Sequence, residues 1–514
     1  MWKQIDYVAR KKPMMQSNTN HHPKACQGVT RRSFLTDTGM GFTGLALSAM
    51  LAKSGLAAPP QTWQSKIDRG RSAAKPKAKT VIWIFLCGGV SHLESFDVKP
   101  ELNKYAGKSI DETPYADVLD PKKVGAKIQS GNPNHGNRKV IMPLQTGYQR
   151  YGKCGLEVGD WFKEIGTCAD DLAVVRSLWT VDNDHGAQLT FQTGRHVREG
   201  AHPTIGSWAS YGLGTLNENL PEFVVLGTPT GDCCGGAWTH GASYLGPEYA
   251  GVRLSTDPKK PLPYLAPADS MTADEQKENF SLLGRLNRIS GIDYPGDKDL
   301  RARIKAYELA FQMQTSIPET LGFEKESAET QALYGMDQNH TREFGQMCLA
   351  ARRMAERGVR FIQIFHGGGG GGAWDAHSAI KQNHTDLAAQ VDKPIAGLLK
   401  DLKRRGMLDD TLVVWTTEFG RTPITQGIGA TGRDHHPFAY TCWMAGAGLK
   451  PGLRYGETDE LGYDSVTSPV SVYDFHATVL RLLGIDHTKL TFYHNGIRRR
   501  LTNVEGHVID GILA

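Results

Sequence analysis

The 514-residue sequence lacks an apolar run long enough to cross a membrane. The weakly apolar run Gly39–Ala52 has about 14 residues, whereas a hydrocarbon core needs roughly 20. Hydrophobic residues make up 39% of the chain and charged residues 22%, which is ordinary for a globular protein. This composition excludes both a polytopic membrane protein and a wholly disordered chain.

Paired cysteines of the CxxC type are also missing. The eight cysteines are spread thinly, at positions 26, 87, 154, 168, 233, 234, 348 and 442. This spacing argues against a zinc site built from thiolates. If a leader containing Cys26 is removed, an odd number of cysteines remains. Export would permit a disulfide such as Cys154 with Cys168, for which the sequence supplies no geometry.

Excess positive charge is confined to the N-terminal segment. The whole chain has a net charge of +5, but residues 1–58 hold eight Lys or Arg against two Asp, so the remainder is close to −1. A nearly neutral remainder predicts no nucleic-acid partner.

A basic, then apolar, then small-residue pattern marks the first 58 residues. Thr30-Arg31-Arg32-Ser33-Phe34-Leu35 precedes the apolar run, and Ala57-Ala58-Pro59 follows it. This order is that of a secretory leader, and the paired arginines resemble the twin-arginine signature. We predict a twin-arginine signal segment at 1–58, recognition by the twin-arginine export machinery, and a periplasmic or cell-envelope location. The alternative is an amphipathic surface helix with two accidental arginines.

Strand and helix signals alternate after a polar linker at residues 59–78. Residues 81–86 form a continuous apolar run of strand length. Helical spacing over 342–357, a strand at 359–365, a helix to Arg405 and a strand at 411–416 repeat the βαβ pattern. The sequence therefore predicts an α/β domain over 79–514, with a mainly parallel central sheet flanked by helices. Functional side chains gather in the loops after the strands of such sheets.

Residues 228–340 interrupt this pattern. Gly-rich turns at 231–236 and a Pro-rich stretch at 258–267 precede a charged helical segment at 299–315. We predict an insertion or cap whose loops shape a substrate cleft, and solvated surface is the alternative.

Two of the loops after strands offer polar groups for an anionic substrate. The first holds Ser91 and His92, predicted to bind substrate, and Asp97, a candidate metal ligand. A capped turn with a solvated Asp97 is the alternative. The second holds Asp184 and His185 before a helix start, where free N–H groups favour an oxyanion. We predict that either residue acts as base or nucleophile, unless Asp184 is only an N-cap.

Two further loops offer metal ligands. Six glycines after the 359–365 strand lead to Asp375 and His377, which suit a hard or borderline cation. After the 411–416 strand come Glu418 and then the pair His435 and His436. We predict that these five residues hold a divalent metal, either zinc, manganese or calcium. The alternative is a surface Asp and His on a flexible loop.

Two arginines accompany these ligands. Arg421 is predicted to bind a sulfate or phosphate group, because a planar guanidinium binds such anions through two hydrogen bonds. Arg433 is predicted to be catalytic and to stabilise developing negative charge. A structural pair between Arg421 and Glu418 is the alternative.

These loops, in this order, resemble the DUF1501 family, whose fold is related to that of alkaline phosphatases and sulfatases. The resemblance covers roughly residues 78–514 and implies an alkaline phosphatase-like core. It rests on GGVSHLESFDVKP at 88–100, DHGAQLTFQTGRH at 184–196, HPTIGSWASYGLG at 202–214, WDAH at 374–377, TTEFGRTP at 416–423, GRDHHP at 432–437 and YDFHATVLRLLGID at 473–486.

The pattern of the wider superfamily is only partly present. Counting back from the sulfatase-like stretch Phe191–Arg195 places Asp184 where sulfatases carry their nucleophilic cysteine, which argues against formylglycine chemistry. The stretch Thr416–Gly420 is similar to the superfamily's metal motif, but Phe419 replaces a ligand histidine. The metal-binding Asp after the first strand is absent or displaced to Asp97.

These features predict an exported, metal-dependent hydrolase of sulfate or phosphate esters. The expected partner is an anionic small molecule or a sulfated or phosphorylated glycan, such as an extracellular polysaccharide. A catalytically reduced binding or envelope-assembly protein that keeps the fold is the alternative, because superfamily ligands are missing. Metal-dependent group transfer is a third interpretation.

Overall fold

The computed structural model describes residues 70, 72, 75–120, 139–257, 260–262, 272–293, 304, 309, 312–314, 316–425 and 429–514. The chain divides into two units, Met1–Ile67 and Asp68–Ala514, and the described residues belong to the second. The predicted signal segment lies outside the described residues, as do most of the linker and of the 299–315 segment. No helix in the described part of the chain is both long and apolar enough to span a bilayer.

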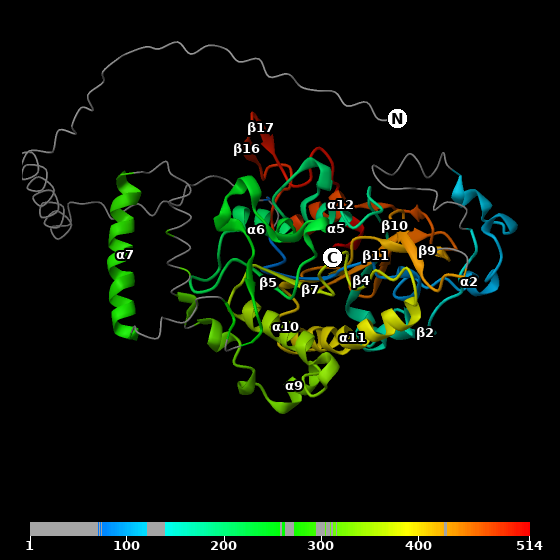
Figure 1. Cartoon of the computed structure of the whole chain (residues 1–514), viewed down its shortest axis with the longest axis horizontal. Helices are drawn as coiled ribbons and strands as arrows, with labels where there is room; N and C mark the ends of the chain where they lie inside the picture. Colours follow the sequence, from blue (N-terminus) through cyan, green and yellow to red (C-terminus); the bar gives the residue numbers. More distant parts are fainter. Residues whose placement is uncertain are drawn as a thin grey trace, which may run out of the picture. The chain divides into compact units, whose positions relative to one another are not determined.

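A nine-stranded sheet forms the centre of the second unit (Figure 1). The strand order is β12-β4-β11-β8-β1-β7-β5-β6, with β15 paired to β4. The strand pairings are parallel except for those of β11, which runs opposite to β8 and β4. The strands are β1 (Thr80–Leu86), β4 (Leu172–Trp179), β5 (Phe223–Leu226), β6 (Val252–Leu254), β7 (Phe361–His366), β8 (Thr411–Thr416), β11 (Tyr440–Ala445), β12 (Leu453–Tyr455) and β15 (Val470–Ser471).

Both faces of the sheet are covered, which explains the unbroken apolar run of β1. Ile82 and Ile84 pack into one hydrophobic cluster, whereas Trp83 and Phe85 pack into another, because strand side chains alternate between faces. In Figure 1, α10 (Asn339–Glu356) and α11 (Ile380–Arg404) lie below the sheet, whereas α5 (Ala187–Thr193), α6 (Ile205–Leu213) and α12 (Val472–Leu482) lie above it.

The remaining elements are short helices, a longer helix and four two-stranded sheets. The helices are α2 (Glu101–Lys104), α4 (Lys163–Gly166), α7 (Ala273–Asp293) and α9 (Ala328–Leu333). The paired strands are β2 (Tyr148–Tyr151) with β3 (Leu156–Gly159), β9 (Gly420–Thr425) with β10 (Arg433–His436), β13 (Glu457–Thr458) with β14 (Ser465–Thr467), and β16 (Phe492–His494) with β17 (Ile497–Arg499).

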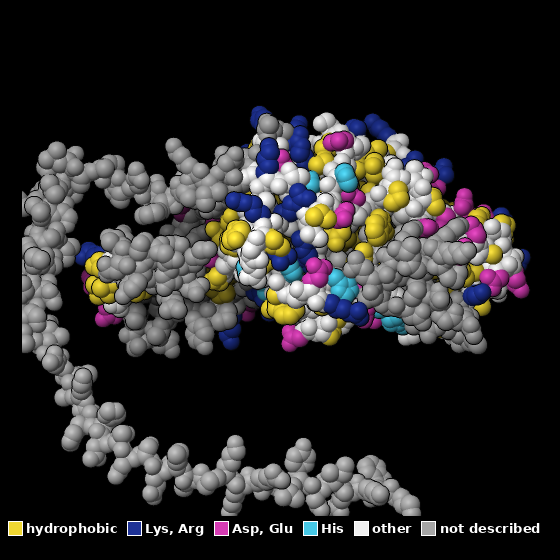
Figure 2. Space-filling view, turned by 90° about the horizontal axis from the view of Figure 1, so that it is seen from above, with side chains coloured by type: hydrophobic (Ala, Val, Ile, Leu, Met, Phe, Trp, Pro, Cys, Tyr) yellow, Lys and Arg dark blue, Asp and Glu magenta, His cyan; other side chains and the backbone are white. Residues whose placement is uncertain are grey.

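The α/β prediction with a mainly parallel sheet is confirmed, since the expected order of β1, α10, β7, α11 and β8 is present. Strand β6 lies inside the segment 228–340 and extends the central sheet beside β5. A cap role for that segment stays a prediction. On the face seen in Figure 2, basic, acidic and histidine side chains are interspersed among apolar ones.

The topology brings four loops to one edge of the sheet. Strands β1, β7 and β8 are parallel neighbours, and β4 runs in the same direction because β11 opposes both it and β8. The loops that leave the carboxyl ends of these four strands therefore lie at the same edge.

Candidate metal centre

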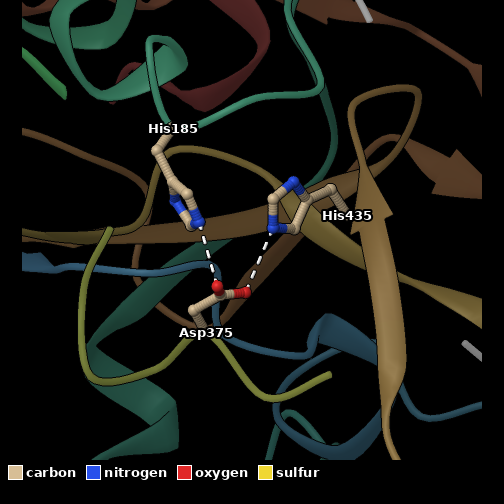
Figure 3. Close-up of side chains that lie close together, drawn as sticks. All are labelled: His185, Asp375 and His435. Carbon is tan, nitrogen blue, oxygen red and sulfur yellow. Dashed lines mark hydrogen bonds and ion pairs between the residues drawn. The ribbon is translucent and has the colours of Figure 1, made fainter. Parts of the chain in front are cut away.

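Side chains from separate loops meet at this edge around Asp375, which follows β7 (Figure 3). Its Oδ2 lies 3.1 Å from His185 Nε2, and its Oδ1 lies 3.1 Å from His435 Nε2. His377 Nε2 is 3.0 Å from the same Oδ1. Glu418 Oε1, after β8, is 3.2 Å from His185 Nδ1. We call these five residues the histidine–carboxylate cluster.

Close backbone packing delivers Asp375 to the cluster. A Cβ added to Gly372, whose φ is +119°, would lie 2.3 Å from the Cys87 carbonyl carbon. A Cβ added to Gly371 would lie 2.7 Å from the His185 ring. The glycine run therefore allows the loop after β7 to press against the end of β1 and against an imidazole of the cluster.

Glu418 is fixed by the loop after β1. The backbone N–H of Gly88 donates to Oε1 at 2.9 Å and to Oε2 at 3.1 Å, and the Thr417 hydroxyl donates to Oε2 at 3.0 Å. The carboxyl group is fully buried. These contacts hold a carboxylate against His185 in one orientation.

Arg421, at the start of β9, joins two of the loops. Its side chain is fully buried, and Nε donates to the Gly89 carbonyl at 2.8 Å. Nη2 donates to the Trp374 carbonyl at 3.2 Å and to Asp375 Oδ1 at 2.8 Å. The predicted substrate-binding arginine is thus occupied by protein acceptors, and its acidic partner is Asp375 in place of the expected Glu418.

The charges of the cluster favour a proton or a cation inside it. Asp375 and Glu418 supply two negative charges and Arg421 supplies one positive charge. Burial opposes a charged His185, but hydrogen bonds to the two carboxylates outweigh it and raise the pKa of His185 to about 9. Burial also opposes ionisation of Asp375, yet three histidines and Arg421 hold the pKa of its carboxyl well below the usual range. A protonated His185 therefore completes the charge balance.

The donor atoms fit a divalent cation. In two groups the ligand atoms all lie within 4.8 Å of one another, and the groups are His185, Asp375, His435 and His377, Asp434, His435. Tetrahedral ligands at zinc distances lie about 3.3 Å apart. The contacts of Asp375 with the three histidines are 3.0–3.1 Å. Imidazole nitrogen and carboxylate oxygen together suit zinc or manganese.

A second polar network lies beside the cluster and is buried. Arg433 Nη2 lies 2.7 Å from Glu94 Oε1, with both side chains fully buried. Nη1 donates to the Thr422 carbonyl at 3.0 Å, and Nη2 also donates to the Pro143 carbonyl at 2.9 Å. The Ser91 hydroxyl donates to Glu94. We call Ser91, Glu94 and Arg433 the Glu94–Arg433 network.

This network changes the interpretation of two predicted site residues. Arg433 is held by Glu94 and by backbone carbonyls, so we assign it a structural role in place of the predicted catalytic one. Ser91 likewise bonds to Glu94, and its backbone N–H donates to His384 Nε2 at 3.2 Å. We retain neither residue among the groups that meet the substrate.

The adjacent histidines of β10 face different surroundings. His435 pairs with Arg421, and His436 pairs with Gly420, across the β9–β10 ladder. Because successive strand residues point to opposite sides, only His435 reaches the cluster. His436 is fully buried, bonds to the Tyr463 carbonyl and stacks on His92 with ring centroids 6.2 Å apart.

The other predicted residues occupy different positions. His92 Nε2 is 2.9 Å from the Gly462 carbonyl, and His92 is buried. Asp97 is buried beside Lys99 at 3.1 Å and Arg176 at 3.6 Å, so we do not retain it as a ligand. Asp184 is exposed, and its Oδ1 accepts the N–H of His185 at 2.8 Å.

One candidate ligand escaped the sequence analysis. Asp434 Oδ1 lies 3.7 Å from His377 Nδ1, and Asp434 belongs to the second ligand group. Its place directly before His435 was the available signal. The seven cysteines in the described part of the chain are free thiols, so the Cys154–Cys168 disulfide is not formed.

Comparison with known proteins identifies the family. Residues 78–513 match the model of DUF1501, described as "Protein of unknown function (DUF1501)". The chain belongs to the DUF1501 family. None of the curated proteins compared with this DUF1501 chain matches it.

Solved structures similar to this DUF1501 chain include sulfatase and phosphatase structures at low similarity. A structure of Ps i-CgsB in complex with k-i-k-neocarrahexaose matches at 10% identity and a TM-score of 0.33, over 80% of this chain and 72% of that one. Alkaline phosphatase from the Antarctic bacterium TAB5 matches at 12% and 0.28, over 80% and 99%. PsFucS1 sulfatase from Pseudoalteromonas sp. matches at 15% and 0.28, over 66% and 68%. These TM-scores are too low to transfer residue roles or activity.

Proposed function

We propose that this DUF1501 protein is an exported, metal-dependent hydrolase of sulfate or phosphate esters. The observation that carries the proposal is the convergence of His185 and Asp375, from two loops, and His435, from β10, at one edge of the sheet. Two imidazoles and a carboxylate form a ligand set that leaves coordination positions open, as catalytic metal sites require.

In this proposal His185, Asp375 and His435 hold the cation, with His377 and Asp434 beside them. A bound divalent cation would polarise the ester and lower the pKa of an attacking water. His185, first predicted as a base or nucleophile, becomes a ligand because both of its ring nitrogens face carboxylates. Asp184 is exposed next to it and is the proposed proton acceptor.

The remaining cluster residues position these ligands. Glu418 faces His185 Nδ1 and thereby directs Nε2 of the same ring toward Asp375. Arg421 holds Asp375 and the ends of two loops together. Metal identity in the proposal is zinc or manganese, and calcium is less suited because it takes six to eight oxygen ligands.

Turnover of model esters tests the proposal directly. Purified protein, stripped with a chelator and reloaded with zinc, manganese or calcium, should hydrolyse p-nitrophenyl sulfate or p-nitrophenyl phosphate. The matched control is Asp375→Asn, which keeps the side-chain shape but removes the charge. Inactivity of the wild-type protein with all three metals and both esters would contradict the hydrolase proposal.

A second candidate function is a binding or envelope-assembly protein without turnover. It is favoured because Arg421 and Arg433, the two arginines predicted to face an anion, already donate to acceptors of the protein itself. Phe419 supports it as well, because it occupies the position where the superfamily motif has a ligand histidine. Its ring packs on that of His435, with the ring centroids 4.4 Å apart. Elemental analysis without bound metal, and an unchanged melting temperature in chelator, would favour this candidate.

Export through the twin-arginine route and the class of substrate are also parts of this proposal. The paired arginines at Arg31 and Arg32 support recognition by the twin-arginine machinery and a periplasmic or cell-envelope location. The proposed substrate is an anionic small molecule or a sulfated or phosphorylated glycan. Replacing both arginines with lysine should retain the protein in the cytoplasm, as fractionation and immunoblotting would show.

A further inference from the structure

Two adjacent cysteines lie in contact beside the cluster. Cys233 and Cys234 belong to the short turn η7 (Asp232–Cys234), and their Sγ atoms are 2.8 Å apart. A disulfide needs about 2.05 Å, so a small local movement would bring the two sulfurs to bonding distance. Cys233 is exposed, whereas Cys234 is only 4% exposed.

Other cysteines in the described part of the chain have different neighbours. Cys154 Sγ is directed to the Tyr151 carbonyl, and Cys168 Sγ to the Ala396 carbonyl. Cys233 and Cys234, by contrast, have each other's sulfur as a neighbour at 2.8 Å.

The turn that holds this pair is bonded to the loop that carries Asp375. The Gly231 N–H donates to the Gly370 carbonyl at 3.1 Å, and Cys233 Sγ lies 3.7 Å from the same oxygen. One residue further along, Gly371 packs against the His185 ring. A displacement of the cysteine turn would therefore reach two members of the cluster through one short loop.

We propose that Cys233 and Cys234 form a redox-sensitive pair that a small-molecule or protein disulfide oxidises to a disulfide between neighbours. We propose further that closing this ring shifts the loop 366–377. The site is a modification site of the chain itself, and it does not depend on the proposed hydrolase activity.

The reaction balances as two thiol–disulfide exchanges. The exposed Cys233, as its thiolate, attacks one sulfur of the donor disulfide, forms a mixed disulfide and releases the first donor thiol. Cys234 then attacks the Cys233 sulfur, closes the ring and releases the second donor thiol. The pair loses two protons and two electrons, and the donor gains them. Burial and the neighbouring Cys233 raise the pKa of the Cys234 thiol, so the exposed Cys233 is the sulfur that attacks the donor first.

Mass spectrometry tests the modification. The tryptic fragment 199–253 contains Cys233 and Cys234 and no other cysteine. After incubation of the folded protein with oxidised glutathione, alkylation and digestion, this fragment should be lighter than its reduced form by two hydrogen atoms and should carry no alkyl group. Double alkylation, or a stable glutathione adduct on Cys233 alone, would overturn the proposal.

Hydrogen exchange tests the movement of the loop. Amides of residues 367–372 should exchange at rates that differ by about tenfold between the oxidised and reduced proteins. Cys233→Ser should lose this response to the oxidant, and Cys154→Ser, the matched control, should keep it. Equal exchange rates in the oxidised and reduced wild-type protein would contradict the coupling to the loop.

Discussion

The histidine–carboxylate cluster and the Glu94–Arg433 network are built from similar residues at neighbouring strand ends, yet their chemistry differs. Asp375 keeps 25% of its side chain exposed and faces three imidazoles, whereas Glu94 is fully buried and faces a guanidinium. An imidazole loses its proton near neutral pH, but a guanidinium stays charged. A protonated imidazole next to Asp375 can therefore be replaced by a metal ion while Arg421 stays charged beside it, whereas the guanidinium next to Glu94 cannot be replaced in this way.

This contrast separates a candidate binding site from a structural ion pair. Arg421 links the two regions, because its Nη1 donates to the Arg433 carbonyl at 3.1 Å while Nη2 donates to Asp375 at 2.8 Å. The buried network can thus support the cluster without contacting a ligand. Changes in the cluster should alter binding, and changes in the network should alter stability.

The largest effect is expected from Asp375→Asn. The amide keeps the size of the side chain but removes the charge that faces three histidines, so zinc and manganese affinity should fall by more than about 100-fold. Isothermal titration calorimetry measures this change, and ester turnover should disappear with it. Asp434→Asn is the matched control and should weaken binding less. Undiminished affinity in Asp375→Asn would remove Asp375 from the ligand set.

Glu94→Gln should destabilise the fold without changing metal affinity. It leaves the buried Arg433 without its ionic partner, which costs about 3–5 kcal/mol in the free energy of unfolding. Urea unfolding measures the loss. A double variant, Glu94→Leu with Arg433→Met, replaces the pair with apolar groups and should recover much of the stability. A fall in the metal affinity of folded Glu94→Gln would contradict the assignment of binding to the cluster and of stability to the network.

The neighbouring histidines of β10 allow a direct comparison of the two roles. His435→Ala should lower metal affinity by about 10–100-fold with a small change in stability. His436→Ala should leave affinity unchanged and lower the free energy of unfolding by about 1–3 kcal/mol, because it removes a buried hydrogen bond to Tyr463. Calorimetry and thermal unfolding of both variants check the pair. Equal effects on binding would contradict the opposed orientations of the two rings.

The smallest effect is expected from a change of one pH unit. The raised pKa of His185, about 9, means that this imidazole is protonated at neutral pH when no metal is bound. A cation must displace that proton, so apparent metal affinity should rise with pH up to about 9, by at most about tenfold per unit. Titrations in buffers of different ionisation enthalpy should detect proton release at pH 7–8. An affinity that does not vary with pH would show that His185 is no ligand.

The sequence predicted the sheet well because its strands are buried on both faces. The run 81–86 and the repeat from 342 to 416 gave the strand and helix order within a few residues. The predicted strand order also placed Asp375, His377, Glu418 and His435 at one edge of the sheet, because the carboxyl ends of parallel strands meet there. The structure brings these residues together. Their use as metal ligands stays a prediction.

Long-range pairing limited the prediction of individual roles. Arg433 contacts Glu94, which lies 339 residues earlier in the chain, and no local pattern announces such a partner. Asp97 likewise pairs with Arg176, which is distant in the sequence, as well as with its near neighbour Lys99. Adjacent residues on a strand look equivalent in a motif such as His435-His436, although the fold turns them to opposite sides.

His435 has a consequence for stoichiometry. Its Nδ1 lies 2.8 Å from the Asn183 carbonyl, which leaves Nε2 to face both Asp375 and His377. A single nitrogen lone pair cannot serve two ions at once, although both ligand groups include this residue. The two ligand groups therefore cannot both hold an ion through His435, and the histidine–carboxylate cluster of the described residues should saturate at one equivalent of metal.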